Sequence, residues 1–337
     1  MASKPELFDH LDNGEPVLRH WLEAGQLRVA ILNFGATLQD LRLAGIAHPL
    51  VLGARNVAAY RQAAQYFGAT VGRVANRIAQ GRATLDGRQY RLCRDSEQTH
   101  MLHGGPDGTH NQLWTIADAD RDQITLKLSL PDGHMGFPGL LDIRLTYRLI
   151  APATLEMCIE ARADATTLCN FAHHSYFNLD GTPSVLDHRL QIAAEHYLPT
   201  DGALIPTGEV ARVSGTRFDF RQTRPIRCDG ENKSYDLNFC LDSFAGLHEP
   251  IATLHGPQSG IRMQMYSSEP GLQIYDGQHI TVPADQTLSG IAYVPFAGIA
   301  LEAQKWPDAV HHPAFPSIRL EPGQVYRQTT RWCFLRD

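Results

Sequence analysis

Apolar and polar residues alternate along much of the chain. The alternation is clearest in residues 124–130, 143–149, 155–161 and 261–265, where every second residue is apolar and most residues between them are polar. Because successive side chains of a strand point to opposite faces, this pattern predicts strands with one buried face, as is typical of antiparallel sheets. Helical spacing of apolar residues is scarce, and residues 56–65 form the best candidate for a short helix.

Turn-forming residues separate these segments. Asp86-Gly87 lies between two short strand-like pieces, which predicts a hairpin, and a Pro-Asp-Gly turn occupies 131–133. The chain contains 28 Gly and 20 Pro, and it shows no internal repeat and no linker. We therefore expect residues 1–337 to form a single domain of the all-β class, a large antiparallel β-sandwich.

Composition narrows the range of functions. The 43% hydrophobic content is enough for a large core. The net charge of −6 comes from well-mixed charges, 30 basic and 36 acidic, which argues against a nucleic-acid or membrane surface. No apolar run reaches the roughly 18 residues of a spanning helix, and the N-terminus lacks the apolar segment of a signal peptide. The six cysteines are scattered without a Cys-x-x-Cys pair, which predicts reduced thiols in a cytoplasmic protein.

One carboxylate interrupts an apolar, strand-like run. Glu302, Gln304 and Trp306 are spaced two apart, so they share one face of an extended chain. Leu301 and Ala303 face the other way. A buried carboxylate has to be hydrogen-bonded or used in chemistry. An ion pair with an arginine at the rim of a sheet is the structural alternative to a catalytic role.

Polar clusters interrupt the strand pattern at five further places. They contain Arg73, Asn76 and Arg77; His103 before a glycine pair; His173, His174 and Tyr176; Asp236; and Gln273 with Tyr275. Each has a structural alternative, because arginines form surface ion pairs, histidines cap turns, and buried polar groups are usually hydrogen-bonded to neighbours. Glycines 104 and 105 would then provide positive φ after His103. Together these side chains suit an uncharged, polyhydroxylated ligand on which protons are moved.

A metal site is the main chemical alternative. A three-ligand set could be drawn from His103, His173, His174, His311, His312 and Glu302. However, no His-x-His or His-x-x-x-His pair occurs among them, and adjacent histidines of a strand point to opposite faces. The sequence also lacks a Gly-x-Ser-x-Gly elbow and a phosphate-binding glycine loop. We therefore expect neither a metal nor a cofactor.

Six motifs point to a known family. They are Asn-Arg-Ile at 76–78, Leu-His-Gly-Gly at 102–105, His-Ser-Tyr-Phe-Asn-Leu at 174–179, Tyr-Asp-Leu-Asn-Phe at 235–239, Pro-Gly-Leu-Gln-Ile-Tyr at 270–275 and Leu-Glu-Ala-Gln-Lys-Trp-Pro-Asp-Ala at 301–309. Their type and order resemble the aldose 1-epimerase (galactose mutarotase) family over most of the chain. The resemblance implies a large antiparallel β-sandwich, which agrees with the strand pattern. It also implies an isomerase that interconverts the α and β anomers of free aldohexoses such as glucose and galactose.

The resemblance assigns roles to individual residues. Glu302 is the base that takes the proton of the C1 hydroxyl, and His174 is the acid that protonates the ring oxygen. The ring opens, C1 rotates and the ring recloses with the opposite configuration. The residues implied to bind the sugar are Asn76, Arg77, His103, Tyr176, Asp236 and Gln273, and His103 could share the acid role. The expected partner is a monosaccharide, bound by a monomer or homodimer, with no nucleic acid and no membrane.

The chain departs from the family pattern around these motifs. Ala172 replaces the usual Thr before the acid motif, and residues 106–114 lack the usual Gly-Phe. These differences concern sugar preference more than proton transfer. Two alternatives remain: a hexose-phosphate epimerase of related fold, which needs an added cationic pocket, and a non-catalytic sugar-binding domain, which would be expected to lose Glu302 or His174.

The two adjacent histidines can be separated by strand alternation. If residues 170–178 form a strand, Phe171, His173 and Phe177 share one face, and His174, Tyr176 and Asn178 share the other. The first face is suited to the core and the second to a sugar cleft. We therefore predict that His173 is structural and that His174 is the acid.

Overall fold

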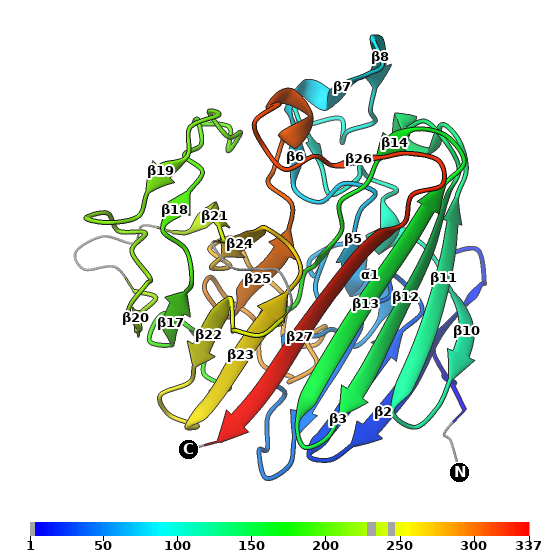
Figure 1. Ribbon diagram of the computed structural model, residues 1–337. Coiled ribbons are helices and arrows are strands. Elements are labelled where there is room, and N and C mark those ends of the chain that lie inside the picture. The colour runs from blue at the N-terminus through cyan, green and yellow to red at the C-terminus, as the bar shows by residue number, and fades with distance from the viewer. Residues whose placement is uncertain (1–3, 228–233, 242–246, 337) are drawn as a thin grey trace.

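The computed structural model describes residues 4–227, 234–241 and 247–336. Almost all of its regular structure is antiparallel β-sheet, which confirms the expected fold class (Figure 1). The largest sheet has nine strands in the order β10 (Thr115–Ala119), β11 (Gln123–Leu130), β12 (Leu141–Ile150), β13 (Thr154–Ala163), β27 (Tyr326–Arg336), β23 (Ile261–Ser267), β22 (Ala252–His255), β17 (Arg189–Ile192) and β20 (Arg224–Pro225). Every second residue of β12 and of β23 is buried, as the sequence alternation predicts.

A second sheet of six strands carries most of the chemistry-bearing motifs. Its order is β16 (Tyr176–Phe177), β25 (Ile299–Gln304), β24 (Gly271–Tyr275), β21 (Asp236–Cys240), β18 (His196–Tyr197) and β19 (Ala211–Arg212). Figure 1 shows β24 and β25 beside β27 of the nine-stranded sheet. Both sheets contribute side chains to the same apolar core, for example Met157 of β13 and Leu301 of β25. This is the arrangement of a sandwich.

A third sheet and several short strand pairs complete the fold. The third sheet has the order β1 (Glu6–His10), β2 (Pro16–Ala24), β3 (Leu27–Leu32) and β4 (Leu38–Leu43). The short pairs are β5 (Thr70–Val71) with β15 (Ala172–His173), β6 (Arg77–Ile78) with β9 (Met101–Leu102), β7 (Arg82–Leu85) with β8 (Arg88–Arg91), and β14 (Thr167–Leu168) with β26 (Arg319–Leu320). The hairpin β7–β8 confirms the turn predicted at Asp86-Gly87, where both residues have positive φ, 51° and 76°.

The predicted helix is shorter than the segment proposed from the sequence. Helix α1 (Val57–Tyr60) begins after Asn56, whose side-chain oxygen accepts a hydrogen bond from the Ala59 amide at 2.8 Å. Turns follow up to residue 68. Short 3-10 helices lie at η1 (Ala79–Gly81), η2 (Thr109–Asn111), η3 (His134–Gly136) and η4 (Ala309–His311).

The six-stranded sheet has one apolar face and one polar face. Leu301 and Ala303 of β25 belong to the shared core, as predicted from their spacing. On the opposite face, Glu302 pairs in register with Gln273 of β24, which pairs in turn with Asn238 of β21. Residues directly opposite each other in an antiparallel pair share a face. The polar face is therefore where a site can form.

Two further findings bear on the class of protein. No helix among the described residues is long and apolar enough to span a bilayer. Among the described cysteines, those at 93, 158, 169 and 333 are free thiols. Cys228 lies outside the described residues.

Candidate active site

Glu302 lies at the centre of the polar face. Its carboxyl group is almost completely buried, with 2% of the side chain exposed. The Oε1 atom lies 3.5 Å from Nε2 of His174, and Oε2 is buried without a hydrogen-bond partner among the described residues. No arginine lies within ion-pair distance of this carboxylate in the described ranges, so the rim ion pair considered from the sequence does not form.

His174 occupies a break between two short strands. The predicted continuous strand over 170–178 is wrong, because Ala172–His173 pairs with β5 whereas Tyr176–Phe177 pairs with β25. At the break, the His174 amide donates to Ala69 O at 2.9 Å and its carbonyl accepts from Gly68. The change of partner strand leaves the predicted alternation of faces intact, so His174 and Tyr176 both line the cavity.

His173 points away from the cavity. Its Nδ1 lies 3.2 Å from the Tyr147 hydroxyl and its Nε2 lies 2.7 Å from the Ser175 hydroxyl. The ring also packs against Trp332, with centroids 4.9 Å apart. Because the Tyr147 hydroxyl donates to Ala36 O, it accepts from His173, and Ser175 then donates to Nε2. Both ring nitrogens are satisfied inside the core, as a structural role requires.

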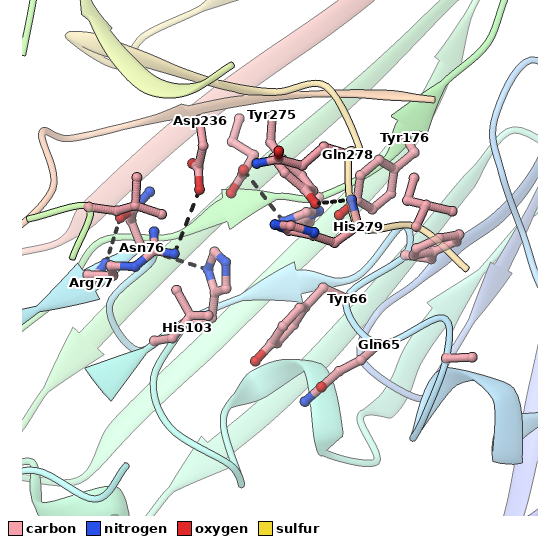
Figure 2. A pocket seen from close by; sticks show the side chains of 17 residues that line it. Gln65, Tyr66, Asn76, Arg77, His103, Tyr176, Asp236, Tyr275, Gln278 and His279 are labelled. Carbon is pink, nitrogen blue, oxygen red and sulfur yellow. Dashed lines mark hydrogen bonds and ion pairs between the residues drawn. The ribbon is translucent and has the colours of Figure 1, made fainter. Parts of the chain in front are cut away.

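A tight loop pair presents Asn76, Arg77 and His103. Asn76 and His103 have positive φ, 59° and 50°. The Asn76 amide donates to His103 Nδ1 at 3.2 Å, and the His103 amide donates to Asn76 O at 3.0 Å. Gly104 must follow at φ 86°, since a Cβ there would lie 1.9 Å from Gly72 O. These bonds fix the imidazole of His103 toward the cavity (Figure 2).

Asp236 connects the loop pair to the sheet. One carboxylate oxygen accepts from Gln273 Nε2 at 2.5 Å, and the other lies 3.7 Å from the Arg77 guanidinium. Arg77 and Asp236 line the cavity, whereas Gln273 is not among the lining residues and lies behind Asp236. Arg73, a candidate from the same sequence motif, is buried elsewhere and donates to Pro138 O, Gly139 O and Thr167 Oγ1.

These groups surround one cavity of about 450 Å³. Ligand pockets in proteins usually have volumes of about 300–1,000 Å³. Of the predicted site residues, seven line it: Asn76, Arg77, His103, His174, Tyr176, Asp236 and Glu302. Others were not predicted from the sequence, among them Gln65, Tyr66, Leu204, Gln278, His279 and Ile280 (Figure 2). Tyr66 has φ 69°, and its ring lies 4.8 Å from that of His103 and 5.8 Å from that of His174.

Burial controls the protonation of the central groups. Burial raises the pKa of Glu302 well above its usual value, the Asp236 charge raises it further, and Arg77 opposes this. Burial lowers the pKa of His174 to about 4. It also lowers the pKa of His103 well below its usual value, with smaller contributions from His174 and His110. Burial therefore favours neutral forms of all three groups.

His103, His174 and Glu302 also form a possible ligand set, because one ligand atom from each lies within 4.8 Å of the others. The hydrogen bond to His103 Nδ1 argues against a metal. Since Nδ1 accepts from the Asn76 amide, the ring proton of neutral His103 is on Nε2, which leaves no free lone pair for an ion. Histidines that bind metals normally donate their second N–H instead. The three residues do not fit a resident metal.

Comparisons with known proteins identify the family. The aldose 1-epimerase family model matches residues 20–333. Galactose mutarotase from Rattus norvegicus is 41% identical over 334 residues, 95% of each chain, and that from Homo sapiens is 39% identical over the same share. Aldose 1-epimerase from Escherichia coli is 33% identical over 92% of each chain.

Solved structures of related proteins have the same fold. Galactose 1-epimerase from Lactobacillus acidophilus superposes with a TM-score of 0.85 at 28% identity, covering 100% of this chain and 99% of that one. An aldose epimerase homologue from C. elegans gives a TM-score of 0.88 at 27% identity, covering 94% of this chain and 99% of that one. The family match, the near full-length identity and the shared architecture lead to one conclusion: the chain belongs to the aldose 1-epimerase family.

Proposed function

We propose that this aldose 1-epimerase interconverts the α and β anomers of free aldohexoses such as glucose and galactose, with Glu302 as base and His174 as acid. The observation that carries the assignment is the 3.5 Å approach of His174 Nε2 to Glu302 Oε1 inside a polar cavity. A base and an acid on the two sides of the C1–O5 unit are sufficient for ring opening. Each positioned proton transfer contributes roughly 10²- to 10⁴-fold.

Sugar binding would prepare the charged forms that the reaction uses. Burial by itself favours a neutral carboxyl group and a neutral imidazole. A bound sugar would donate its C1 hydroxyl to Glu302 and accept from His174 at the ring oxygen, and hydrogen bonds to a charged form favour that form. The attraction of the resulting ion pair at 3.5 Å is about 5 kcal/mol at an effective dielectric constant of about 20.

The proton balance closes over one turnover. Glu302 takes the C1 hydroxyl proton while His174 gives a proton to the ring oxygen, which breaks the C1–O5 bond and yields the open aldehyde. After rotation about C1–C2, His174 takes back the hydroxyl proton at C5 and Glu302 returns its proton to O1. His103, whose Nε2 carries a proton, would donate to the ring oxygen or to a neighbouring hydroxyl.

The remaining polar groups suit sugar hydroxyls. Asn76, Arg77 and Asp236 line the cavity as donors and acceptors, Gln273 orients Asp236, and Tyr176 supplies a wall. Arg77 is the one arginine or lysine among the described lining residues, and Asp236 lies beside it. A phosphate group would meet little net positive charge there. We therefore favour free aldohexoses over hexose phosphates.

Three further expectations belong to this proposal. We propose a single domain over residues 1–337, acting as a monomer or homodimer on its monosaccharide. We propose a cytoplasmic location, supported by the free thiols at 93, 158, 169 and 333. The alternative of a non-catalytic sugar-binding domain is disfavoured by the presence of both Glu302 and His174 in one cavity.

Polarimetry tests the function. Freshly dissolved α-D-glucose and α-D-galactose change rotation as they equilibrate, and the purified protein is expected to speed this change in proportion to its concentration. Equilibration at the uncatalysed rate, with binding of the sugars still measurable by calorimetry, would support the non-catalytic alternative.

A further inference from the structure

Asp308 is a buried carboxylate outside the cavity to which no role has been assigned. It lies in the segment after β25, immediately before η4, at a left-handed φ of 54°. Its side chain is 2% exposed. Both its backbone and its side chain contact the segment that carries Arg77, although the two segments are more than 200 residues apart in the sequence.

The contacts hold the backbone at Arg77 and two residues after it. The Asp308 amide donates to Arg77 O at 3.1 Å, and Asp308 Oδ1 accepts from the Ala79 amide at 2.9 Å. No side chain other than that of Asp308 accepts from the Ala79 amide among the described residues. The preceding residue, Asn76, is held separately by His103. Asp308 therefore fixes the backbone between Arg77 and Ala79.

Two histidines flank the carboxylate of Asp308. His311 Nδ1 lies 2.6 Å from Oδ1, and His312 Nε2 lies 3.8 Å from Oδ2. The hydrogen bond to Asp308 raises the pKa of His311 against the effect of burial. A charged acceptor makes a stronger hydrogen bond to a backbone amide than a neutral one does.

We propose that Asp308 is a positioning residue for sugar binding, acting through Arg77. By holding Arg77 O and the Ala79 amide, it sets where the guanidinium stands beside Asp236 at the cavity wall. The kinetic test of this inference rests on the proposed function, because it measures KM and kcat for mutarotation. Because Asp308 touches neither Glu302 nor His174 and does not line the cavity, it should act on substrate binding and leave the proton transfers unchanged.

Two variants remove the contact in different ways. Asp308→Gly deletes the carboxylate at a backbone conformation that glycine adopts without strain. Ala79→Pro deletes the amide donor instead. Proline fits there because Ala79 opens η1 and the preceding Ile78 is extended, with φ −120° and ψ 121°. Asp308→Asn is the conservative variant, since asparagine tolerates left-handed φ and retains an acceptor for Ala79.

The structure offers a matched control at Asp180. Its side chain is also 2% exposed, its Oδ1 accepts from the amides of Gln258 and Ser259, and it lies 3.8 Å from a histidine, His188. It does not line the cavity. Asp180→Gly therefore removes an equally buried loop-fixing carboxylate that, among the described residues, makes no hydrogen bond or ion pair with Arg77 or with the residues lining the cavity.

The experiment measures kcat and KM for α-D-galactose by polarimetry, and Kd for galactose by calorimetry. We expect Asp308→Gly and Ala79→Pro to raise KM and Kd about 10-fold with kcat within about 3-fold, since a misplaced binding group removes ground-state binding. Asp308→Asn should remain within about 3-fold of the original KM, and Asp180→Gly should leave KM unchanged. In an Arg77→Met background, Asp308→Gly should raise KM by less than about 2-fold, because residues acting through one another are not additive.

Several results would overturn the proposal. They are an unchanged KM and Kd in both variants, a fall in kcat at unchanged KM, an equal rise in KM for Asp180→Gly, and fully additive effects with Arg77→Met. If the unaltered protein shows no mutarotation, the proposed function fails, while the Kd comparison still decides whether Asp308 positions Arg77. If Asp308→Gly does not fold, Ala79→Pro gives the same comparison.

Discussion

The adjacent histidines provide a sharp test, because the structure places one in the core and the other in the cavity. His173→Asn removes the bond to Tyr147 at 3.2 Å or the bond to Ser175 at 2.7 Å, together with the packing on Trp332. A buried polar group that loses its hydrogen-bond partner costs about 1–3 kcal/mol, so the free energy of unfolding should fall by about that amount. His174→Asn removes the proposed acid, whose Nδ1 has no partner among the described residues to lose.

The expected shift in melting temperature follows from the size of the chain. An unfolding entropy of about 2.1 cal/mol/K per residue over 337 residues is about 0.7 kcal/mol/K. A loss of 1–3 kcal/mol therefore lowers Tm by about 1.5–4 °C. We expect His173→Asn to show this loss and to retain most of kcat, and His174→Asn to lose about 100-fold or more in kcat with Tm within about 1 °C.

The assay measures both quantities for both proteins, Tm by calorimetry and kcat by polarimetry. His110→Asn is a suitable control for burial, since His110 is a buried histidine whose two nitrogens have no partner in the described structure. If the two effects are exchanged, so that His173→Asn abolishes turnover and His174→Asn costs only stability, His173 is the acid and the assignment of the two faces is wrong.

Three further predictions concern metal, substrate charge and pH. Activity should survive exhaustive dialysis against EDTA, because His103 Nδ1 accepts from Asn76; stoichiometric zinc whose removal stops turnover would refute this. Glucose should have a higher kcat/KM than glucose 6-phosphate, since Arg77 is the one arginine or lysine lining the described cavity; the reverse order would favour a hexose-phosphate epimerase. The pKa of His174 is lowered to about 4 and that of Glu302 is raised. The pair that shares one proton therefore takes up a second proton only near pH 4. With both groups protonated, Glu302 can no longer act as the base. On folded protein, kcat/KM should therefore stay level down to about pH 5 and fall below it, and an acid limb centred near pH 6.5 would contradict the burial argument.

The sequence predicted the positions of the strands better than it predicted which strands pair with each other. Period-2 alternation identified β11, β12, β13 and β23, and Asp86-Gly87 identified the β7–β8 turn, because these signals are local. The break at His174 was not predicted, since it depends on an exchange of partner strand from β5 to β25 that a single segment does not encode. The length of α1 was overestimated, because the helix ends at Tyr60 and the rest of the segment continues as turns.

The same distinction holds for the site. Glu302 and His174 were predicted from local strand alternation together with the motifs of the family, and both line the cavity. Tyr66 was missed because a positive φ at a residue other than glycine has no sequence signal that could have indicated it. Gln273 was predicted to bind sugar, yet it bonds to Asp236 and does not line the cavity. The sequence could not show which of the two polar residues, Asp236 or Gln273, faces the cavity.

The central claim is that Glu302 is the base, and one measurement tests it most directly. Glu302→Gln keeps the shape of the side chain and removes its basicity. The rate of mutarotation of α-D-galactose, followed by polarimetry, should fall by about 100-fold or more. Tm should not fall, because Gln replaces a buried carboxyl group that has an unpaired oxygen among the described residues. A variant that folds normally and turns over within a few fold of the unaltered protein would contradict the account.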